Sequence, residues 1–420
     1  MFTQDAIKNN DIKVKSVKMI IRGDILKDNL YKMNISLRKP FVKAVKFKLP
    51  KTYIGADQRY VLIDILKELN VKNVLMVVGR HVMHNHEIDD ILNSLNEIDI
   101  KYEIFTGVRP DPDFNMVEEC RTLGKDAEAI VAIGGGSVID VAKVTKALVK
   151  NDIEAKKMVG MFKANHKLVP LIAIPTTAGT GSEVTLAAVI SDENHLKHQV
   201  LDPRIVPEYA ILDPVLSANL SLSTSYNTAF DALSHALEAY VSKYADEKSC
   251  NDSKIAIKLI FDNLLNLEKH PEDLEIRTKL LKASYHAGLA FTRVYIGYVH
   301  AFAHALAAKT NISHGLANAI LLPKVMRYYL DSCQKEFADL AKLLDQDFHN
   351  ELNNARFFVD SLEQLAKKAK IQTYVEGFKI SDIDEVIDLA FKECHMTYPV
   401  PKYYSRIDAY NLLLSIVEKD

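Results

Sequence analysis

The chain has 420 residues, of which 48% are hydrophobic and 26% are charged, and its formal net charge is −2. This length is too great for one compact core and predicts two domains, while the composition excludes a chain that is disordered throughout. No apolar run reaches the roughly 18 residues that a membrane helix requires, and the four cysteines stand singly. We therefore expect a cytoplasmic protein without a disulfide framework and without a membrane partner.

The beginning of the chain is a basic extension. Residues 1–51 carry 13 Lys and Arg against 4 Asp and Glu. These basic residues are spaced among Ile, Leu, Val and Asp, which is more typical of a solvated face than of a nucleic-acid-binding arm. We expect no nucleic-acid partner, and we assign residues 1–43 to an extension that precedes the first domain.

From about residue 70, short apolar runs alternate with helical stretches. Strands bounded by Gly, Pro or Asp are predicted at residues 74–78, 102–105, 129–133 and 171–174. Strands separated by helices are typical of a parallel, doubly wound sheet. We expect an α/β dinucleotide-binding domain with a parallel sheet over residues 44–214.

After Leu212-Asp213-Pro214 the pattern changes. From about Thr224, apolar residues recur at spacings of three and four, which predicts helices and few strands. The clearest helical segments are residues 229–240, 254–267, 280–291 and 359–368. We expect an all-α domain over residues 215–420.

Two turns at predicted strand ends are suited to binding an anion. The first, in AIVAIGGGSVIDVAK (residues 129–143), is a strand followed by three glycines and a helix, so free N–H groups and the helix dipole favour a phosphate. The second, PTTAGTGSE (residues 175–183), is rich in hydroxyl groups and glycines. Ligands of open parallel sheets bind at the carboxyl ends of strands, so we expect both turns to face one cofactor. A plain solvated turn is the alternative for each.

The helical half concentrates one carboxylate and several imidazoles. Asp231 and His235 are four residues apart, as are His300 and His304, so each pair shares one helix face; His314 follows closely. A single histidine on an apolar face is usually a core residue. Five such groups together would need many buried hydrogen-bond partners, so a shared metal ion is the better explanation. Imidazoles with one carboxylate suit Fe(II) or Zn(II) rather than Ca²⁺ or Mg²⁺.

These motifs resemble the iron-containing alcohol dehydrogenases over roughly residues 45–420. The resemblance rests on GGGSVIDVAK, PTTAGTGSEVT, FDALSHALEAYVS and YVHAFAHALAAKTNISHGLANAILLP, which occur in the family's order. It implies metal ligands at Asp231, His235, His300 and His314, with His304 beside the reacting centre. The cofactor contacts that it implies are Gly135, Gly136, Ser137, Thr176, Thr177 and Lys197.

The resemblance predicts a metal-dependent alcohol dehydrogenase that transfers hydride between a nicotinamide cofactor and a small alcohol or aldehyde. Gly79 and Arg80, at the end of the first cofactor strand, favour NADP(H) over NAD(H), since the family often has an Asp at this glycine when NAD is preferred. The alternatives are a zinc-dependent glycerol-type dehydrogenase, an enzyme similar to dehydroquinate synthase, and a cofactor-binding protein without catalysis. A homodimer is the expected assembly.

Two residues depart from the family's pattern. Phe230 replaces an aliphatic residue directly before Asp231, and Arg293 stands where a smaller polar residue is common. We expect both departures to influence which substrate is accepted. For Arg293 we consider two hypotheses, the selection of anionic substrates and an ion pair between helices.

Overall fold

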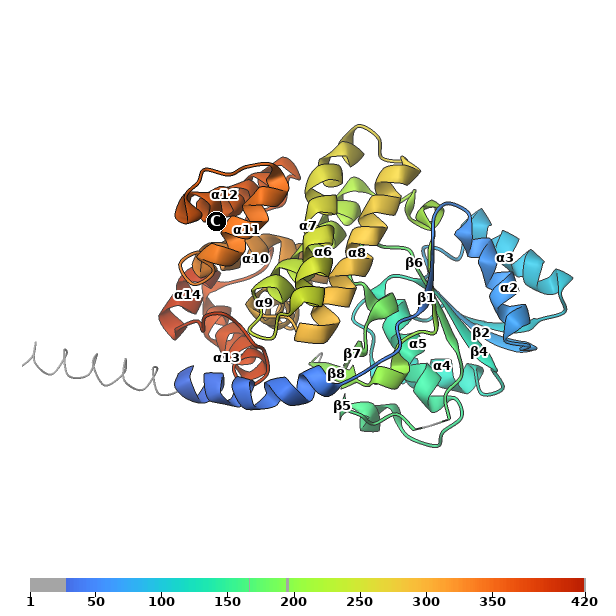
Figure 1. Ribbon diagram of the computed structural model, residues 1–420. Helices are drawn as coiled ribbons and strands as arrows, with labels where there is room; N and C mark the ends of the chain where they lie inside the picture. Colours follow the sequence, from blue (N-terminus) through green and yellow to red (C-terminus); the bar gives the residue numbers. More distant parts are fainter. Residues whose placement is uncertain (1–27, 166, 194–195, 419–420) are drawn as a thin grey trace, which may run out of the picture.

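The computed structural model describes residues 28–165, 167–193 and 196–418 (Figure 1). An α/β part comes first in the chain and a helical part follows, and the two lie side by side. The predicted fold class is therefore confirmed. Within the described residues, no helix combines the length and apolar character needed to cross a membrane.

Six strands form one sheet in which every neighbouring pair is parallel. In order across the sheet they are β1 (Lys51–Ile54), β9 (Tyr209–Leu212), β6 (Leu171–Pro175), β4 (Ala129–Gly134), β2 (Asn73–Val78) and β3 (Lys101–Phe105). The sequence predicted β2, β3, β4 and β6 to within one residue at each end. It missed β1 and β9, which pair with each other although about 160 residues of chain separate them.

Helices cover both faces of this sheet, which explains the continuous apolar runs of its central strands. On one face, α2 (Val61–Glu68) and α3 (His86–Glu97) pack against Val74, Met76 and Val78 of β2. On the other, α4 (Phe114–Leu123) and α5 (Gly136–Leu148) pack against Leu75 and Val77. Successive residues of β2 thus point into different layers, and both layers are buried.

A second, smaller sheet lies within the α/β part. Its strands are β5 (Gly160–Met161), β8 (Lys197–Leu201) and β7 (Ala187–Ser191), in that order. The sequence analysis did not predict it, because β5 has only two residues and β8 begins with three polar ones, Lys197-His198-Gln199. This sheet carries Lys197 to the edge of the cofactor cleft.

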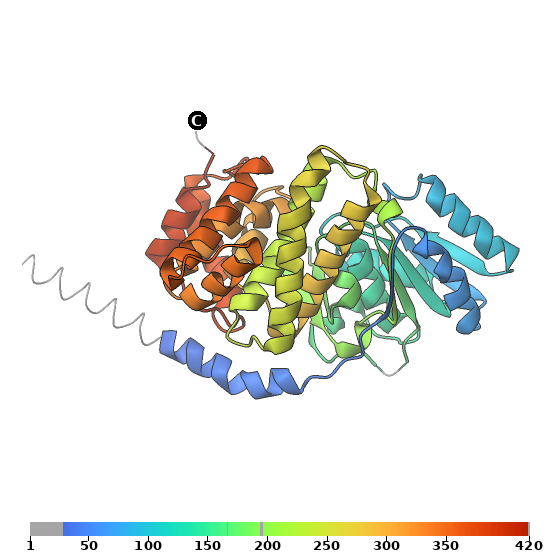
Figure 2. The same ribbon diagram turned by 45° about the horizontal axis from the view of Figure 1, so that its top comes forward.

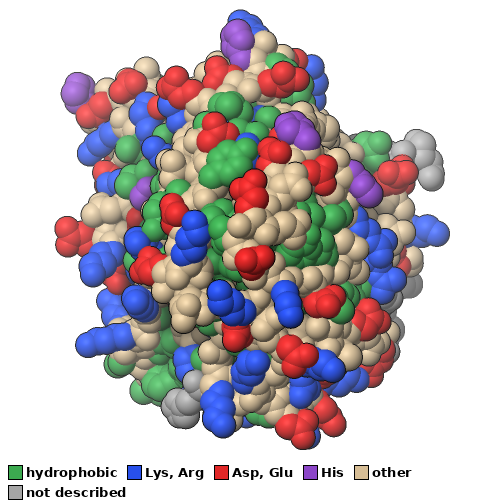
Figure 3. Space-filling model, turned by 90° about the vertical axis from the view of Figure 1, so that its right-hand side faces the viewer, with side chains coloured by type: hydrophobic (Ala, Val, Ile, Leu, Met, Phe, Trp, Pro, Cys, Tyr) green, Lys and Arg blue, Asp and Glu red, His purple; other side chains and the backbone are tan. Residues whose placement is uncertain are grey.

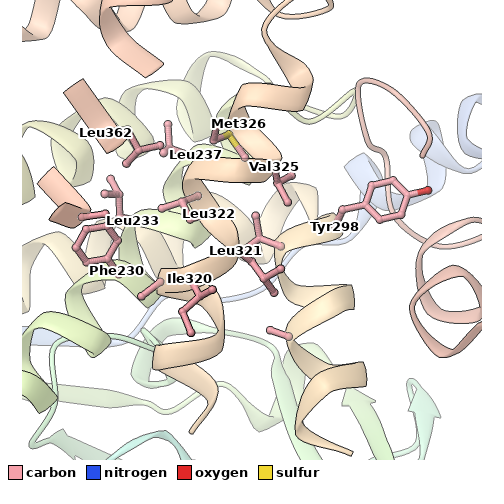
Figure 4. Packing of buried hydrophobic residues seen from close by; sticks show 14 of the residues in the cluster. Phe230, Leu233, Leu237, Tyr298, Ile320, Leu321, Leu322, Val325, Met326 and Leu362 are labelled. Atoms are coloured by element: carbon pink, nitrogen blue, oxygen red, sulfur yellow. The ribbon is translucent and has the colours of Figure 1, made fainter. Parts of the chain in front are cut away.

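The C-terminal half is helical, as predicted. Its helices are α6 (Leu222–Val241), α7 (Glu247–Asn263), α8 (Leu274–Val294), α9 (Tyr298–Ala307), α10 (His314–Tyr329), α11 (Gln334–Ala341), α12 (Glu351–Lys368), α13 (Ile383–Cys394) and α14 (Arg406–Leu414). Figure 4 shows Leu233 and Leu237 of α6 beside Leu322 of α10 and Leu362 of α12, all fully buried. This packing holds α6 and α10, which carry most of the predicted metal ligands.

The described part of the N-terminal extension is a helix over residues 28–44. Figures 1 and 2 both show it running beneath α13 and along the helical part toward the small sheet. Its backbone accepts a hydrogen bond of 2.8 Å at Ile35 O from the Tyr244 hydroxyl, and Arg38 donates to Met396 O at 2.8 Å. The extension is thus packed onto the helical domain, although it precedes the α/β domain in the sequence.

The charges of the surface are mixed in sign. Figure 3 looks at the side of the molecule that lies at the right in Figure 1, where α2 and α3 are found, and acidic and basic side chains alternate over this face. Such interspersed charge is typical of a solvated surface.

Candidate metal centre and cofactor cleft

One cavity of about 1640 Å³ lies between the two domains. Each residue that the sequence analysis assigned to the metal, the cofactor or proton transfer lines it. These residues are Gly79, Gly135, Gly136, Ser137, Thr176, Thr177, Lys197, Asp231, His235, His300, His304 and His314. The structure therefore brings the predicted residues of both domains to one cleft.

The register of the sheet aligns three strand ends at the floor of the cleft. Gly79 N donates to Ile133 O at 2.9 Å, and Thr176 N donates to Gly134 O at 3.0 Å, so the segments after β2, β4 and β6 lie next to one another. In the sheet, β3 lies on one side of β2 and β4 lies on the other side, so the strand order reverses between β2 and β4. The loops at the cleft follow these strands. Dinucleotides bind at such a point.

Glycine is required where these loops approach α5. A Cβ atom on Gly136 would lie 2.5 Å from Thr180 Cγ2, closer than atoms can pack. Gly135 precedes α5 as its N-cap, and a Cβ there would meet only Thr177, at 3.5 Å. Gly136 thus allows the two loops to touch. Gly135 leaves the N-terminus of α5 open toward the cavity, where a pyrophosphate can accept hydrogen bonds from the backbone N–H groups of the helix.

A buried lysine, not singled out by the sequence analysis, joins the two loops. Lys143 of α5 is fully buried, and its Nζ donates to Ser182 Oγ at 2.9 Å, Thr185 Oγ1 at 2.8 Å and Ala187 O at 2.8 Å. Asp140 accepts from Ser182 Oγ at 2.6 Å. Burial lowers the pKa of Lys143 to about 8, although Asp140 and Glu183 oppose that shift. The pattern that could have revealed it is the lysine three residues after Asp140, in the run Val138-Ile139-Asp140-Val141-Ala142-Lys143-Val144, whose other members are apolar.

The predicted metal ligands form a compact group above the loops. The ligand atoms of Asp231, His300 and His314 all lie within 4.8 Å of one another. Asp231 Oδ1 lies 3.6 Å from His300 Nε2, 3.4 Å from His314 Nε2 and 4.0 Å from His235 Nδ1. His235 is the outermost of the four, and its ring stacks on those of Phe291 and His300, with centroid distances of 4.1 and 4.3 Å.

The donor atoms of this group fit a shared cation. His235 Nδ1, His300 Nε2 and His314 Nδ1 are buried and have no hydrogen-bond partner within the protein. Buried polar atoms without partners are costly and rare, and one metal ion beside Asp231 would satisfy His235 Nδ1 and His300 Nε2 together. His314 faces Asp231 with its other nitrogen, Nε2, to which Asn318 donates at 3.1 Å. Three imidazoles and one carboxylate are a donor set for first-row transition metals.

Glu238 and Asn318 support the ligands, and the sequence analysis did not assign either. Glu238 accepts hydrogen bonds from His300 Nδ1 and from Val299 N, both at 2.6 Å, which leaves His300 Nε2 free to face Asp231. Asn318 donates to Asp231 Oδ1 at 2.7 Å. Carboxylates behind metal-binding histidines orient the ring and fix its tautomer. The sequence does place both residues at helical spacing from a predicted ligand, since Glu238 lies three residues after His235 and Asn318 lies four residues after His314.

The electrostatics of the group favour a cation. Burial opposes ionisation of Asp231, but the His235 and His314 imidazoles hold its pKa well below the ordinary value. Burial also opposes a charge on His300, yet Asp231 and Glu238 raise its pKa to about 9. The same two carboxylates that attract a proton to this position attract a metal ion.

His304 lies at the edge of the group. Its ring stacks on His314 at a centroid distance of 5.2 Å, and its Nδ1 lies 2.8 Å from Glu393 Oε1. Since an ionised carboxylate can only accept, Nδ1 carries the proton and Nε2 remains available. Tyr398 donates to the same Glu393 oxygen and accepts from Gln199 of β8 at 2.8 Å, so both domains hold this arrangement. No local pattern in the sequence points to Glu393, which is 89 residues from His304.

Lys197 also faces the cavity. Its Nζ forms an ion pair of 2.9 Å with Asp111, and its side chain is 13% exposed. Although burial opposes ionisation of Asp111, Lys197 keeps the pKa of that carboxyl below its ordinary value. The sequence placed Lys197 in the cleft but gave no sign of its partner Asp111.

The two departures from the family's pattern have different outcomes. Phe230 is fully buried in the helical core, pointing toward Leu233 in Figure 4, and is not among the described residues that line the cavity. Phe230 therefore makes no direct contact with a ligand in the cavity, because its side chain turns into the helical core while Asp231 lines the cavity. Arg293 lines the cavity, but its Nη1 donates to Asp252 of α7 at 2.7 Å and to Leu289 O at 2.6 Å. This contact is the ion pair between helices that was the alternative.

Comparisons with known proteins agree with this geometry. Residues 50–214 match the family model of the iron-containing alcohol dehydrogenases, and residues 225–417 match the model of that family's C-terminal region. Residues 1–49 lie outside both models.

Similar proteins include enzymes that act on alcohols. Long-chain-alcohol dehydrogenase 1 of Geobacillus thermodenitrificans is 32% identical over 340 residues, which cover 79% of this chain and 86% of that protein. The 1,3-propanediol dehydrogenase of Klebsiella pneumoniae is 32% identical over 350 residues, covering 81% and 90%. The solved structure of an alcohol dehydrogenase from Oenococcus oeni matches with a TM-score of 0.84 at 30% identity, covering 88% of this chain and 99% of that one.

The matches, which span both domains, favour the iron-containing group over the other enzymes of this architecture that the sequence left open. The chain therefore belongs to the iron-containing alcohol dehydrogenase family, as a metal-dependent alcohol dehydrogenase that uses a nicotinamide cofactor.

Proposed function

We propose that this enzyme interconverts alcohols and aldehydes in the cleft between its domains, with Fe(II) held by Asp231, His235, His300 and His314 and with NADP(H) preferred over NAD(H). The observation that carries the proposal is a buried carboxylate, Asp231, with two unpartnered imidazole nitrogens beside it, on His235 and His300, and with His314 within the same ligand distance. The direct test is consumption of NADPH by the iron-loaded protein with a panel of aldehydes. If neither NADPH nor NADH is consumed with any aldehyde, the proposed function is wrong.

Separate groups of residues would bind the cofactor and surround the metal centre. Gly135, Gly136 and Ser137 offer the N-terminus of α5 to the pyrophosphate, and Thr176 and Thr177 line the same side of the cavity. When bound, the ion supplies a Lewis acid for the substrate oxygen and the nicotinamide supplies or accepts hydride. Phe291, stacked on His235, keeps one side of this centre apolar and excludes water from it.

We assign proton transfer to His304. Its Nδ1 proton is held by Glu393, so Nε2 can exchange a proton with the substrate side of the cleft. We expect His304→Ala to lower kcat about a hundredfold, the lower end of the usual range for general acid–base groups, without loss of bound iron. Added imidazole should restore part of kcat because it replaces the missing base. The measurements are kcat with and without imidazole and the iron content. An unchanged kcat would remove His304 from the mechanism.

The cofactor preference rests on the end of β2. Gly79 has no carboxylate to repel a 2′-phosphate, and Arg80 also lines the cavity. A Cβ at Gly79 would meet its nearest neighbour, Val82 Cγ2, at 3.6 Å, an ordinary contact, so the backbone there accepts a residue with a side chain.

We therefore expect the parent enzyme to have a higher kcat/KM with NADPH than with NADH, and Gly79→Asp to lower the NADPH-to-NADH ratio at least about tenfold, through repulsion between carboxylate and phosphate. Arg80→Ala is the companion variant, and it should weaken NADPH use while leaving NADH use nearly unchanged. A parent that prefers NADH, or a ratio that Gly79→Asp leaves unchanged, would refute the preference.

We also propose a homodimer in the cytoplasm. The support for a dimer is general, since most soluble oligomers are twofold homodimers. The support for a reducing compartment is that the four cysteines, Cys120, Cys250, Cys333 and Cys394, are all free. Light scattering of the purified protein tests the first, and imaging of the tagged protein in its cell tests the second.

A further inference from the structure

The segment that follows the N-terminal helix forms part of the wall of the cavity. Val42, Val45, Phe47 and Leu49 line it, together with Lys43 and Lys46. Val45 and Phe47 are partly buried, whereas Lys46 and Lys48 are exposed. Between the helix and β1, apolar and basic side chains thus alternate, and Val45, Phe47 and Leu49 line the cavity together with Lys46.

The helix that precedes this segment is held by both domains. On the helical domain, Ile35 O accepts from Tyr244, which follows α6, Arg38 donates to Met396 O after α13, and Tyr31 packs against His395 with ring centroids 4.8 Å apart. On the other domain, Phe41 meets Phe162, directly after β5, edge-on at 6.0 Å. The helix therefore joins the helical domain to the region of the small sheet, and its course is visible in Figures 1 and 2.

The wall lies at the metal end of the cavity rather than at the pyrophosphate end. Phe291, whose ring stacks on the metal ligand His235 at 4.1 Å, packs in the same hydrophobic cluster as Val42, Ile35 and Tyr295 of this region. Val42 of the wall and Phe291 therefore pack against one cluster, which places this end of the wall near His235. The glycines that receive the pyrophosphate lie at the other side of the cleft, on β4 and α5.

The cavity has room for more than a cofactor and a very small alcohol. Its 1640 Å³ exceeds the roughly 300 to 1000 Å³ of common ligand pockets. The apolar residues that line the cavity with Val45 and Phe47 include Met161, Leu186, Leu201 and Phe291. The basic residues Lys43, Lys46 and Lys248 line it as exposed side chains, and Arg293 is already paired with Asp252. An uncharged apolar chain is the ligand that this lining fits.

We propose that residues 42–49 are a specificity wall: the alkyl chain of a long-chain primary alcohol or aldehyde, with its oxygen at the metal centre, lies against Val45 and Phe47. This inference rests on the proposed function for the position of the reacting carbon. The wall belongs to the part of the chain that both family models leave unmatched, so it is a property of this protein beyond its family assignment.

The test compares aldehydes of increasing length in the iron-loaded, full-length enzyme. For the parent, kcat/KM rises from acetaldehyde through butanal to octanal. Phe47→Ala lowers kcat/KM for octanal about tenfold, because the apolar contact of one side chain is lost, and leaves acetaldehyde within about twofold. Lys48→Ala, next to it but exposed and pointing away, is the matched control and leaves both substrates within about twofold. Phe47→Trp, which keeps an aromatic wall but narrows the space, shifts the preference toward shorter aldehydes.

Two results would overturn the proposal of a specificity wall. One is a parent enzyme whose kcat/KM does not rise with the chain length of the aldehyde, and the other is an equal loss of kcat/KM for acetaldehyde and octanal in Phe47→Ala. If Phe47→Ala does not fold, Phe47→Trp decides, and unchanged chain-length dependence in that variant also overturns the proposal. These failures differ from failure of the proposed function, in which the parent reduces neither short nor long aldehydes with either cofactor.

Discussion

His300→Ala is expected to lower kcat/KM for aldehyde reduction at least about a thousandfold, because loss of a ligand removes the Lewis acid that stabilises charge on the substrate oxygen. His300 is almost fully buried between Asp231 and Glu238, so its loss affects both carboxylates. Removing the metal from the unmodified enzyme with a chelator should have the same effect, and added Fe(II) should reverse it. The measurements are kcat/KM and bound iron per chain.

The control must separate loss of metal from loss of the fold. His300→Ala also leaves Glu238 buried without its imidazole, so some stability is lost as well. His314→Ala avoids this problem, since His314 has no such carboxylate behind it, and its activity should fall as far while its unfolding temperature stays close to the parent's. His349→Ala, an exposed histidine outside the cleft, should change neither. A dialysed, metal-free enzyme with full turnover would contradict the metal assignment.

Lys143→Met is expected to lower the free energy of unfolding of the α/β domain by about 3 to 5 kcal/mol, the usual effect of removing one partner from a buried charged network. The substitution takes three hydrogen bonds from the loops after β6 and leaves Asp140 without a neighbouring cation. Burial raises the pKa of Glu183, which also interacts with Lys143, to about 7. Glu183 therefore contributes little negative charge to the network around Lys143.

Urea unfolding of the parent and the variant measures this effect. Lys150→Met is the matched control, because Lys150 follows the same helix but is exposed, and its stability should stay within about 0.5 kcal/mol of the parent. We also expect weaker cofactor binding in Lys143→Met, since the loop that holds Thr176 and Thr177 loses its anchor. Equal unfolding midpoints for Lys143→Met and the parent would show that the buried lysine is not required for the fold.

The sequence by itself determined the fold class and singled out the residues of the proposed metal centre, which the structure brings to one cavity. Both depend on short-range patterns: apolar runs followed by glycines predict β4 and the start of α5, and the four-residue spacing of Asp231 and His235 places them on one face of α6. A helix or strand repeats its geometry every few residues, so such patterns are visible along the chain. The same reasoning failed for Phe230, because its neighbour Asp231 faces the cavity while Phe230 itself turns into the core.

Only the tertiary structure decided which distant side chains complete the site. Asp111 meets Lys197, Glu393 meets His304, and residues of the segment 42–49 line a cavity that is built from both domains. The strands β1 and β9 were missed for the same reason. Each of these contacts joins segments far apart in the chain, and it exists because the packing of whole domains brings them together. The spacing of apolar residues within a helix or strand does not depend on how whole domains pack, so a neighbour across the cleft cannot be deduced from spacing along the sequence.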